Sequence, residues 1–174
     1  MISILRLDHR IHRDIRVTTH LALTARALLA QKFYYTGQKD SKFENTISKM
    51  NNKFGSDFEV IHLEDHIKFL TETNSLKIHL TVYGQPLISK IDLIRKSDKD
   101  IIVIVGGKKV PPVVYNLADF NLSITSQPIS EISAVAIFLN ELLERKPLSY
   151  KFESSKIRIV PQEKGKKVIK DTFK

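Results

Sequence analysis

The sequence contains no cysteine among its 174 residues. This absence excludes a disulfide framework and a thiolate site, and it is typical of a cytosolic protein. No apolar run approaches the roughly 20 residues that cross a bilayer. Arg6, Asp8 and Arg10 interrupt the N-terminal stretch where a signal peptide would be apolar. We therefore expect a globular, cytoplasmic protein that does not enter a membrane.

The common motifs for phosphate, metal and nucleophilic chemistry are also missing. Gly106-Gly-Lys-Lys lacks the spacing of a P-loop, and neither G-x-G-x-x-G nor G-x-S-x-G occurs. His62 and His66 are four residues apart, but a strand is predicted to end between them, so they would not share a helix face. We expect no metal site, and a nucleotide-like ligand must be held in some other way.

Positive charge is concentrated at the two ends of the chain. The formal net charge is +9, of which residues 145–174 contribute +7 and residues 1–26 contribute +3, so that the middle is slightly acidic. Two basic ends on a near-neutral body indicate a polyanionic partner. A solubilising C-terminal tail is the alternative. A membrane surface is not favoured, because no basic amphipathic helix is predicted.

Residues 6–26 form the most informative segment. They hold five of the eight arginines and three of the six histidines of the chain, together with Thr18, Thr19 and Thr24. Guanidinium groups provide rigid, permanently charged donors for phosphate oxygens or a developing oxyanion. The segment also leads from a strand-like start into a helical pattern, the type of turn at which α/β folds bind ligands.

Strand-like and helix-like patterns alternate along the chain, as in an α/β fold with a parallel sheet. The expected strands are Ile2–Leu7, Lys32–Tyr35, Phe58–Leu63, Ile78–Tyr83, Ile101–Val105 and Phe120–Ile124. The expected helices are Thr19–Leu29, with Thr18 or Thr19 as N-cap, Ser41–Phe54, His66–Thr71, Leu87–Arg95, Pro111–Tyr115 and Ser130–Leu143. Lys151–Val160 and Lys166–Phe173 are predicted to form a basic β-hairpin. We thus expect a domain at 1–145 and an extension at 146–174.

Five blocks of sequence resemble one known family. They are Arg-Leu-x-His-Arg-x-x-Arg-Asp-x-Arg-Val-Thr-Thr-His at 6–20, His-Leu-Thr-x-Tyr-Gly at 79–84, Lys-Val-Pro at 109–111, Ser-Gln-Pro-x-Ser-Glu at 126–131, and Ile-x-Ile-Val-Pro-x-Glu-x-Gly-Lys-Lys-Val at 157–168. In this order they resemble the archaeal tRNA (cytidine-56) 2′-O-methyltransferases of the SPOUT superfamily, over essentially the whole chain.

The resemblance implies a Rossmann-like sheet with a deep C-terminal trefoil knot, a homodimer, and S-adenosylmethionine as methyl donor to the T-loop of tRNA. By position, it implies cofactor contacts from Leu80, Gly106, Gly107, Lys108, Lys109, Val110, Ser126, Gln127, Pro128, Ile129, Ser130, Glu131, Ile132 and Ser133. Three positions depart from the family pattern, which commonly has glycine at Asp8, glutamate at Lys108 and histidine at Ile129. A non-catalytic RNA-binding relative and a methyltransferase for another nucleotide are the alternatives.

The arginine-rich segment supplies the candidate catalytic residues. We expect Arg16, or else Arg10, to hold a substrate phosphate or the oxyanion, because a guanidinium hardly ever loses its proton. His20 or His9 is a better proton acceptor, since histidine titrates near neutral pH. Arg26 falls within a predicted helix, where an ion pair is as good an explanation as catalysis.

Overall fold

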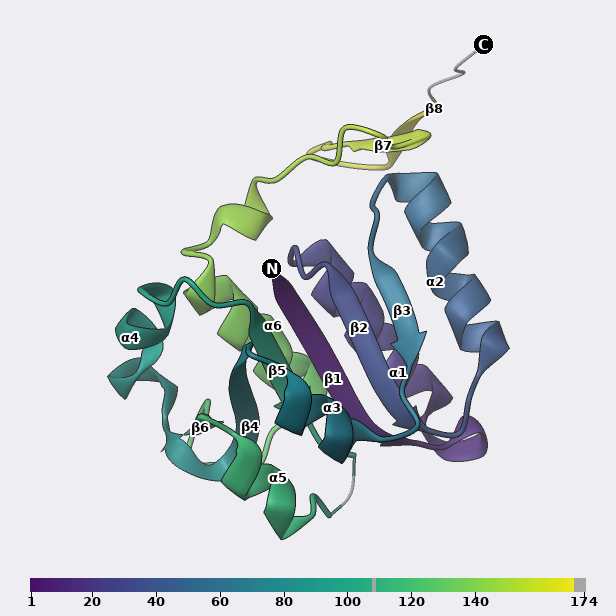
Figure 1. Ribbon diagram of the computed structural model, residues 1–174. Coiled ribbons are helices and arrows are strands. Elements are labelled where there is room, and N and C mark those ends of the chain that lie inside the picture. Colours follow the sequence, from purple (N-terminus) through teal and green to yellow (C-terminus); the bar gives the residue numbers. More distant parts are fainter. Residues whose placement is uncertain (108, 171–174) are drawn as a thin grey trace.

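A computed structural model describes residues 1–107 and 109–170. Six parallel strands form one sheet in the order β3-β2-β1-β5-β4-β6 (Figure 1). The strands are β1 (Ile2–His9), β2 (Lys32–Gly37), β3 (Glu59–His62), β4 (Leu76–Pro86), β5 (Ile101–Val105) and β6 (Phe120–Ser123). All five residues of β5 are buried, as expected of a strand paired on both sides and covered on both faces. The expected parallel α/β sheet is confirmed.

Helices cover both faces of this sheet (Figure 1). They are α1 (Ile11–Ala27), α2 (Ser41–Phe54), α3 (His66–Glu72), α4 (Ile91–Arg95), α5 (Pro112–Leu117) and α6 (Glu131–Leu142). On one face Ile4 of β1 packs with Leu21 of α1 and Phe138 of α6. On the other, Leu5 packs with residues of α3 and α5, such as Val114. Successive residues of β1 therefore face different helices, and Arg6 lies on the same face as Ile4.

Helix α1 begins earlier than the sequence predicts. It starts at Ile11 with Arg10 in the N-cap position, so the expected cap at Thr18 or Thr19 is wrong. The inward positions of its first turns hold Asp14 and Thr18, which are both buried. Since these side chains are polar, the apolar pattern of the buried face begins only at Leu21.

Two other predictions need correction. The expected helix Leu87–Arg95 is divided into a 3-10 turn at Leu87–Ser89 and α4, because Lys90 leaves the helical conformation (φ −126°, ψ −16°). The first strand of the C-terminal hairpin is shorter than expected: β7 (Ile157–Val160) pairs antiparallel with β8 (Lys167–Lys170). Residues 151–156 are not in a strand, and residues 171–174 and Lys108 lie outside the described residues.

Strand β4 contacts β6 in an unusual way. Leu80 and Gln85 both pair with Leu122, so the residues between them form a large irregularity in the parallel ladder, which then continues with Pro86 opposite Ser123. Gly84 lies directly against the β6 backbone, where a Cβ atom would overlap with Asn121 and Leu122. The glycine is required by this close approach rather than by its backbone angles. No described helix is long and apolar enough to cross a membrane.

Candidate functional site

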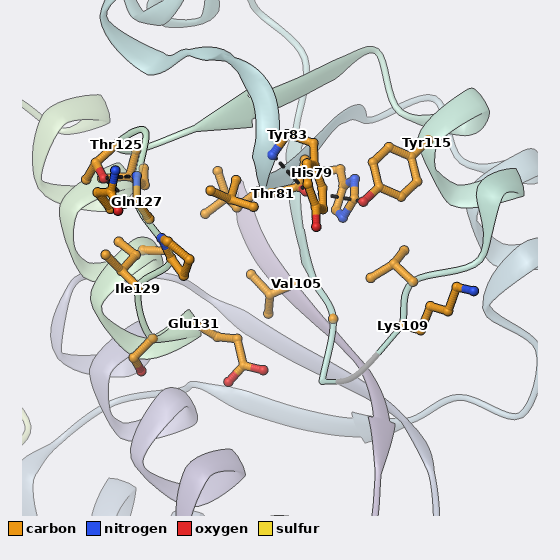
Figure 2. Close-up of a pocket in the computed structure, with 18 of the residues that line it drawn as sticks. His79, Thr81, Tyr83, Val105, Lys109, Tyr115, Thr125, Gln127, Ile129 and Glu131 are labelled. Carbon is orange, nitrogen blue, oxygen red and sulfur yellow. Dashed lines mark hydrogen bonds between the residues drawn. The ribbon is translucent and has the colours of Figure 1, made fainter.

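A cavity of about 840 Å³ opens at the carboxyl ends of β4 and β5 (Figure 2). Three segments form its wall: the end of β4, the stretch after β5, and the loop from β6 into α6. Parallel α/β sheets bind ligands at this edge, and the volume lies within the roughly 300–1,000 Å³ of small-molecule sites. The fold thus brings the blocks at 79–84, 109–111 and 126–131 to a single site.

Most of the residues expected to bind the cofactor line this cavity. They are Leu80, Gly106, Lys109, Val110, Gln127, Pro128, Ile129, Ser130 and Glu131. Gly107 lines a smaller cavity of about 320 Å³ that shares the Gly106, Lys109 and Val110 wall. Ser126, Ile132 and Ser133 are not among the lining residues, and Lys108 lies outside the described part of the chain.

Other lining residues were not predicted. They are Val17, His79, Thr81, Val82, Tyr83, Val105, Tyr115, Ile124, Thr125 and Ala134. His79 Nδ1 lies 2.8 Å from Asn121 Oδ1, its ring meets the Tyr115 ring edge-on, and burial lowers the pKa of this histidine. The Tyr115 hydroxyl is hydrogen-bonded to Thr81 Oγ1 at 3.2 Å. The sequence could have identified His79 and Thr81 as lining residues, because the block at 79–84 places them next to Leu80, which was expected to contact the cofactor.

The start of α6 provides polar backbone groups to the cavity. Ser130 is the N-cap, and its Oγ accepts a hydrogen bond from Ile132 N at 3.2 Å. In the loop before it, Thr125 Oγ1 accepts from Gln127 N at 2.8 Å. The first amides of a helix have no partner within the helix, so they can donate to polar atoms of a ligand.

The arginine-rich segment does not gather at this cavity. Arg16 and His20 are exposed on α1. Arg10 is instead paired with Asp14 of the same helix, with Nε 2.7 Å from Oδ2, and this hydrogen bond lowers the pKa of the carboxyl. Of the residues in this segment, only Val17 lines the cavity itself.

His9 is fully buried, and both of its ring nitrogens have partners. Nδ1 lies 2.8 Å from Thr18 Oγ1, and Nε2 lies 3.3 Å from Asp40 Oδ2. Burial lowers the pKa of His9, so the ring is neutral at neutral pH, with Nε2 donating to Asp40 and Nδ1 accepting from Thr18. No ring nitrogen of His9 is left for a substrate.

Arg26 and Asp8 have structural surroundings that the sequence did not reveal. Arg26 forms no ion pair with the described residues; it donates to Asn51 Oδ1 and to the Gly55 carbonyl, and its guanidinium stacks on Phe152. Asp8 has a φ of 60°, in the left-handed region that glycine adopts most readily. The glycine of the family pattern at this position therefore matches the backbone found here.

Arg6 is a residue of β1, and its side chain lies near the starts of α1 and α6. Its side chain is 1% exposed, and its Nε and Nη1 have no hydrogen-bond partner among the described residues. Burial lowers the pKa of Arg6, and the carboxylates of Glu131 and Asp14 oppose this effect. For Glu131, burial raises the pKa, and the positive charge of Arg6 opposes it. Sequence reasoning assigned no role to Arg6 in the site.

Comparison with known proteins identifies the family. The family model described as tRNA ribose 2′-O-methyltransferase, aTrm56, matches residues 54–169. A tRNA (cytidine(56)-2′-O)-methyltransferase of Methanocaldococcus jannaschii is 45% identical over 98% of this chain and 97% of its own. Its counterpart in Archaeoglobus fulgidus is 43% identical over 98% of this chain and 99% of its own. The relative from Thermoplasma volcanium is 44% identical over 97% of this chain, which spans about half (49%) of that protein.

Solved structures share the fold at low sequence identity. A TrmH/SpoU tRNA-modifying enzyme of A. aeolicus matches with a TM-score of 0.60 and 15% identity, over 83% of this chain and 75% of its own. The SpoU methyltransferase AviRb of Streptomyces viridochromogenes, solved in complex with AdoMet, matches with a TM-score of 0.57 and 12% identity, over 86% and 58%. These structures support the SpoU/TrmH type of α/β fold. The family model and the relatives over 40% identical show that the chain belongs to the tRNA ribose 2′-O-methyltransferase family aTrm56.

Proposed function

We propose that this protein transfers a methyl group from S-adenosylmethionine to the 2′-hydroxyl of cytidine 56 in tRNA. The observation that carries the proposal is the joining of three family sequence blocks around one cavity of about 840 Å³. Relatives over 40% identical along nearly the whole chain are named for this reaction. We place the protein in the cytoplasm, with its tRNA substrate.

A direct test is methyl transfer to an unmodified tRNA transcript, followed by mapping of the methylated nucleotide. The matched control is the same tRNA with 2′-deoxycytidine at position 56, which has no hydroxyl to accept the methyl group. We expect transfer to the first RNA only. Methyl transfer to both RNAs would indicate another target nucleotide. Binding of S-adenosylmethionine without transfer to any tRNA would favour the non-catalytic alternative.

The residues of the large cavity fit the cofactor. Lys109, Val110 and Gly106 form one side, and the loop Gln127–Ser130 forms the other. Apolar side chains such as Leu80 and Ile129 suit the adenine ring, and the free amides at the start of α6 suit its polar atoms. When bound, the cofactor supplies an electrophilic methyl group on a sulfonium. We also assign cofactor contacts to Gly107, Lys108, Ser126, Ile132, Ser133 and the backbone of Glu131.

The exposed arginines of α1 would hold the RNA. Arg13 and Arg16 lie on its solvent side, together with His20. A guanidinium there can bind two oxygens of one phosphate. We expect Arg16→Ala to lower methyl transfer severely while leaving the affinity for S-adenosylmethionine nearly unchanged. An unchanged rate of transfer would refute this role for Arg16.

The C-terminal extension, residues 146–174, would hold a more distant part of the tRNA. The hairpin lies near the end of α2, whereas the large cavity opens at the opposite ends of the strands (Figure 1). Lys164, Lys166 and Lys167 are all exposed. Replacing these three lysines with glutamine should weaken tRNA binding and reduce its salt dependence, because fewer counterions are released. Binding of S-adenosylmethionine should stay the same. An unchanged salt dependence would make the hairpin a structural element.

We propose that the chain has the deep trefoil knot implied by its family relationship. The knot would place the residues from β6 into α6 beside the irregular part of β4, where Gly84 lies against the β6 backbone. True knots are very rare in proteins, so only a specific family relationship makes one credible.

A homodimer is also supported. Tyr83 and Ile88 are each 85% exposed, and Leu93 on the neighbouring α4 is 58% exposed. Neighbouring exposed apolar side chains mark interaction surfaces. Sedimentation analysis should give a dimer for the native chain and a monomer for Ile88→Glu; a native monomer would refute the homodimer.

A further inference from the structure

The proposed reaction needs a proton acceptor inside the cavity, and the described lining offers few. Its titratable side chains are those of His79, Tyr83, Lys109, Tyr115 and Glu131. A group that accepts a proton at neutral pH must be partly deprotonated there and within reach of the substrate. Lysine and tyrosine hold their protons at this pH. Of the side chains described at this wall, the two that can serve are those of His79 and Glu131.

His79 is already engaged and is only 1% exposed. Its Nδ1 is directed at Asn121, and Tyr115 covers its ring edge-on. Among the earlier candidates, His9 has no free nitrogen and His20 does not line the cavity. Neither His9 nor His20 therefore presents a free nitrogen to a ligand in this cavity, and the ring of His79 is almost wholly buried.

Glu131 is placed differently. It is the first residue of α6 and lines the cavity. Figure 2 shows its carboxylate pointing away from the helix, below the Val105 side chain in this view. Its carboxylate makes no ion pair within 4.0 Å and no hydrogen bond with the residues that the structure describes. The carboxylate is therefore available to a hydroxyl group that enters the cavity.

The charges around Glu131 set its basicity. Burial raises the pKa of Glu131, which makes the carboxylate a stronger base than an exposed one. Arg6 on β1 opposes this rise with its positive charge, and Asp14 on α1 adds to it. The N-terminus of α6 also favours the anionic form. Arg6 keeps part of its hydrogen-bonding capacity free in the same region, through its unpartnered Nε and Nη1.

We propose that Glu131 is the general base that accepts the proton of the ribose 2′-hydroxyl, an inference that rests on the proposed function. The 2′-oxygen forms a bond to the methyl carbon while the carbon–sulfur bond breaks and leaves its electron pair on sulfur. The hydroxyl proton moves to a carboxylate oxygen of Glu131 and then to water. The products are the 2′-O-methylated tRNA and S-adenosylhomocysteine.

The test compares the wild type with Glu131→Gln, which keeps the shape of the side chain and cannot accept the proton. Glu141→Gln, near the C-terminal end of α6 and outside the cavity lining, is the matched control. We expect Glu131→Gln to lower kcat about 10²- to 10⁴-fold, to leave the dissociation constant of S-adenosylmethionine within about threefold, and to remove the fall of kcat at acidic pH. Glu131→Asp should keep that pH dependence at a reduced rate, because a carboxylate remains.

A second measurement does not depend on turnover. A ¹³C-carboxyl NMR titration of the wild-type protein should show one glutamate signal that is lost in Glu131→Gln and that titrates above the other glutamates. Its midpoint should agree with the acidic limb of kcat. A midpoint at or below those of the other glutamates would overturn the proposal.

The remaining outcomes separate the two hypotheses. An active wild type together with an equally active Glu131→Gln overturns the role of Glu131 alone. A variant that has lost affinity for S-adenosylmethionine in proportion to its activity shows that the side chain binds the cofactor instead. A folded wild type that binds the cofactor but methylates no tRNA overturns the proposed function, and the general base with it.

Discussion

Replacement of Arg26 should detach the C-terminal extension from the body of the protein. Arg26 is 6% exposed and lies in the last turn of α1. Its Nε donates to Asn51 Oδ1 at 2.9 Å, its Nη2 donates to the Gly55 carbonyl at 2.8 Å, and its guanidinium lies 5.0 Å from the centre of the Phe152 ring. It thus connects α1 and α2 to the segment that leads into the hairpin.

The expected loss follows from these contacts. A hydrogen bond from a charged donor contributes about 1.5–3 kcal/mol, and a cation–π contact contributes roughly 0.5–2 kcal/mol. Because Arg26→Ala removes two such bonds and one such contact, we expect the free energy of unfolding to fall by about 3.5–8 kcal/mol. Arg26→Lys keeps the charge but not the paired donors, so its loss should be smaller.

Urea unfolding at one fixed protein concentration measures this loss, and limited proteolysis reports the release of residues 146–156. The double variant Arg26→Ala, Phe152→Ala should lose less than the sum of the two single variants, since both remove the same stacking contact. Fully additive effects would refute the stacking contact. A loss below about 1 kcal/mol in Arg26→Ala would refute its role in holding the extension, because such a loss is typical of a surface residue.

Two further predictions concern the first loop and the buried histidine. Asp8→Gly should stabilise the protein by up to about 1 kcal/mol, because glycine adopts a positive φ without the penalty of a side chain; thermal unfolding measures this, and a clear loss would contradict it. Since burial lowers the pKa of His9, the unfolded chain binds more protons below about pH 6.5, and stability should fall as the pH drops. His9→Gln should reduce this fall in urea titrations at pH 7.5 and 5.5, whereas replacing the exposed His12 should not; equal slopes for all three proteins would count against the buried neutral ring.

Apolar patterns in the sequence predicted most strands and helices. Ile101–Val105 and Ser41–Phe54 were placed with the bounds that the structure has, because each combines a clear apolar pattern with flanking signals such as Gly55. The start of α1 was missed because its inward residues, Asp14 and Thr18, serve as polar partners of Arg10 and His9. Hydrophobic periodicity cannot find a helix turn that faces inward with polar groups.

The site was predicted only in part, because its buried polar residues also leave no apolar pattern in the sequence. The resemblance placed residues on all three walls of the cavity, whereas the candidate catalytic residues of the arginine-rich segment do not line it. Arg6 carried a detectable signal, because it occupies a core-facing position two residues after Ile4 in an apolar strand. A charged residue at such a position is costly to bury and points to a functional role. The position of Glu131 beside Arg6 depends on how α6 packs on β1, which local sequence does not encode.

The cavity is formed by segments far apart in the sequence, which has a consequence for biosynthesis. The cavity is walled by residues near Leu80 and by residues beyond Ile124, so it does not exist in a nascent chain until α6 has been made. A ribosome-bound fragment that ends before α6 should therefore have no affinity for a cavity ligand. Once the chain is complete, a ligand bound in the cavity stabilises the folded state by mass action. Ligand binding thus distinguishes chains in which α6 has been made and packed from shorter ones.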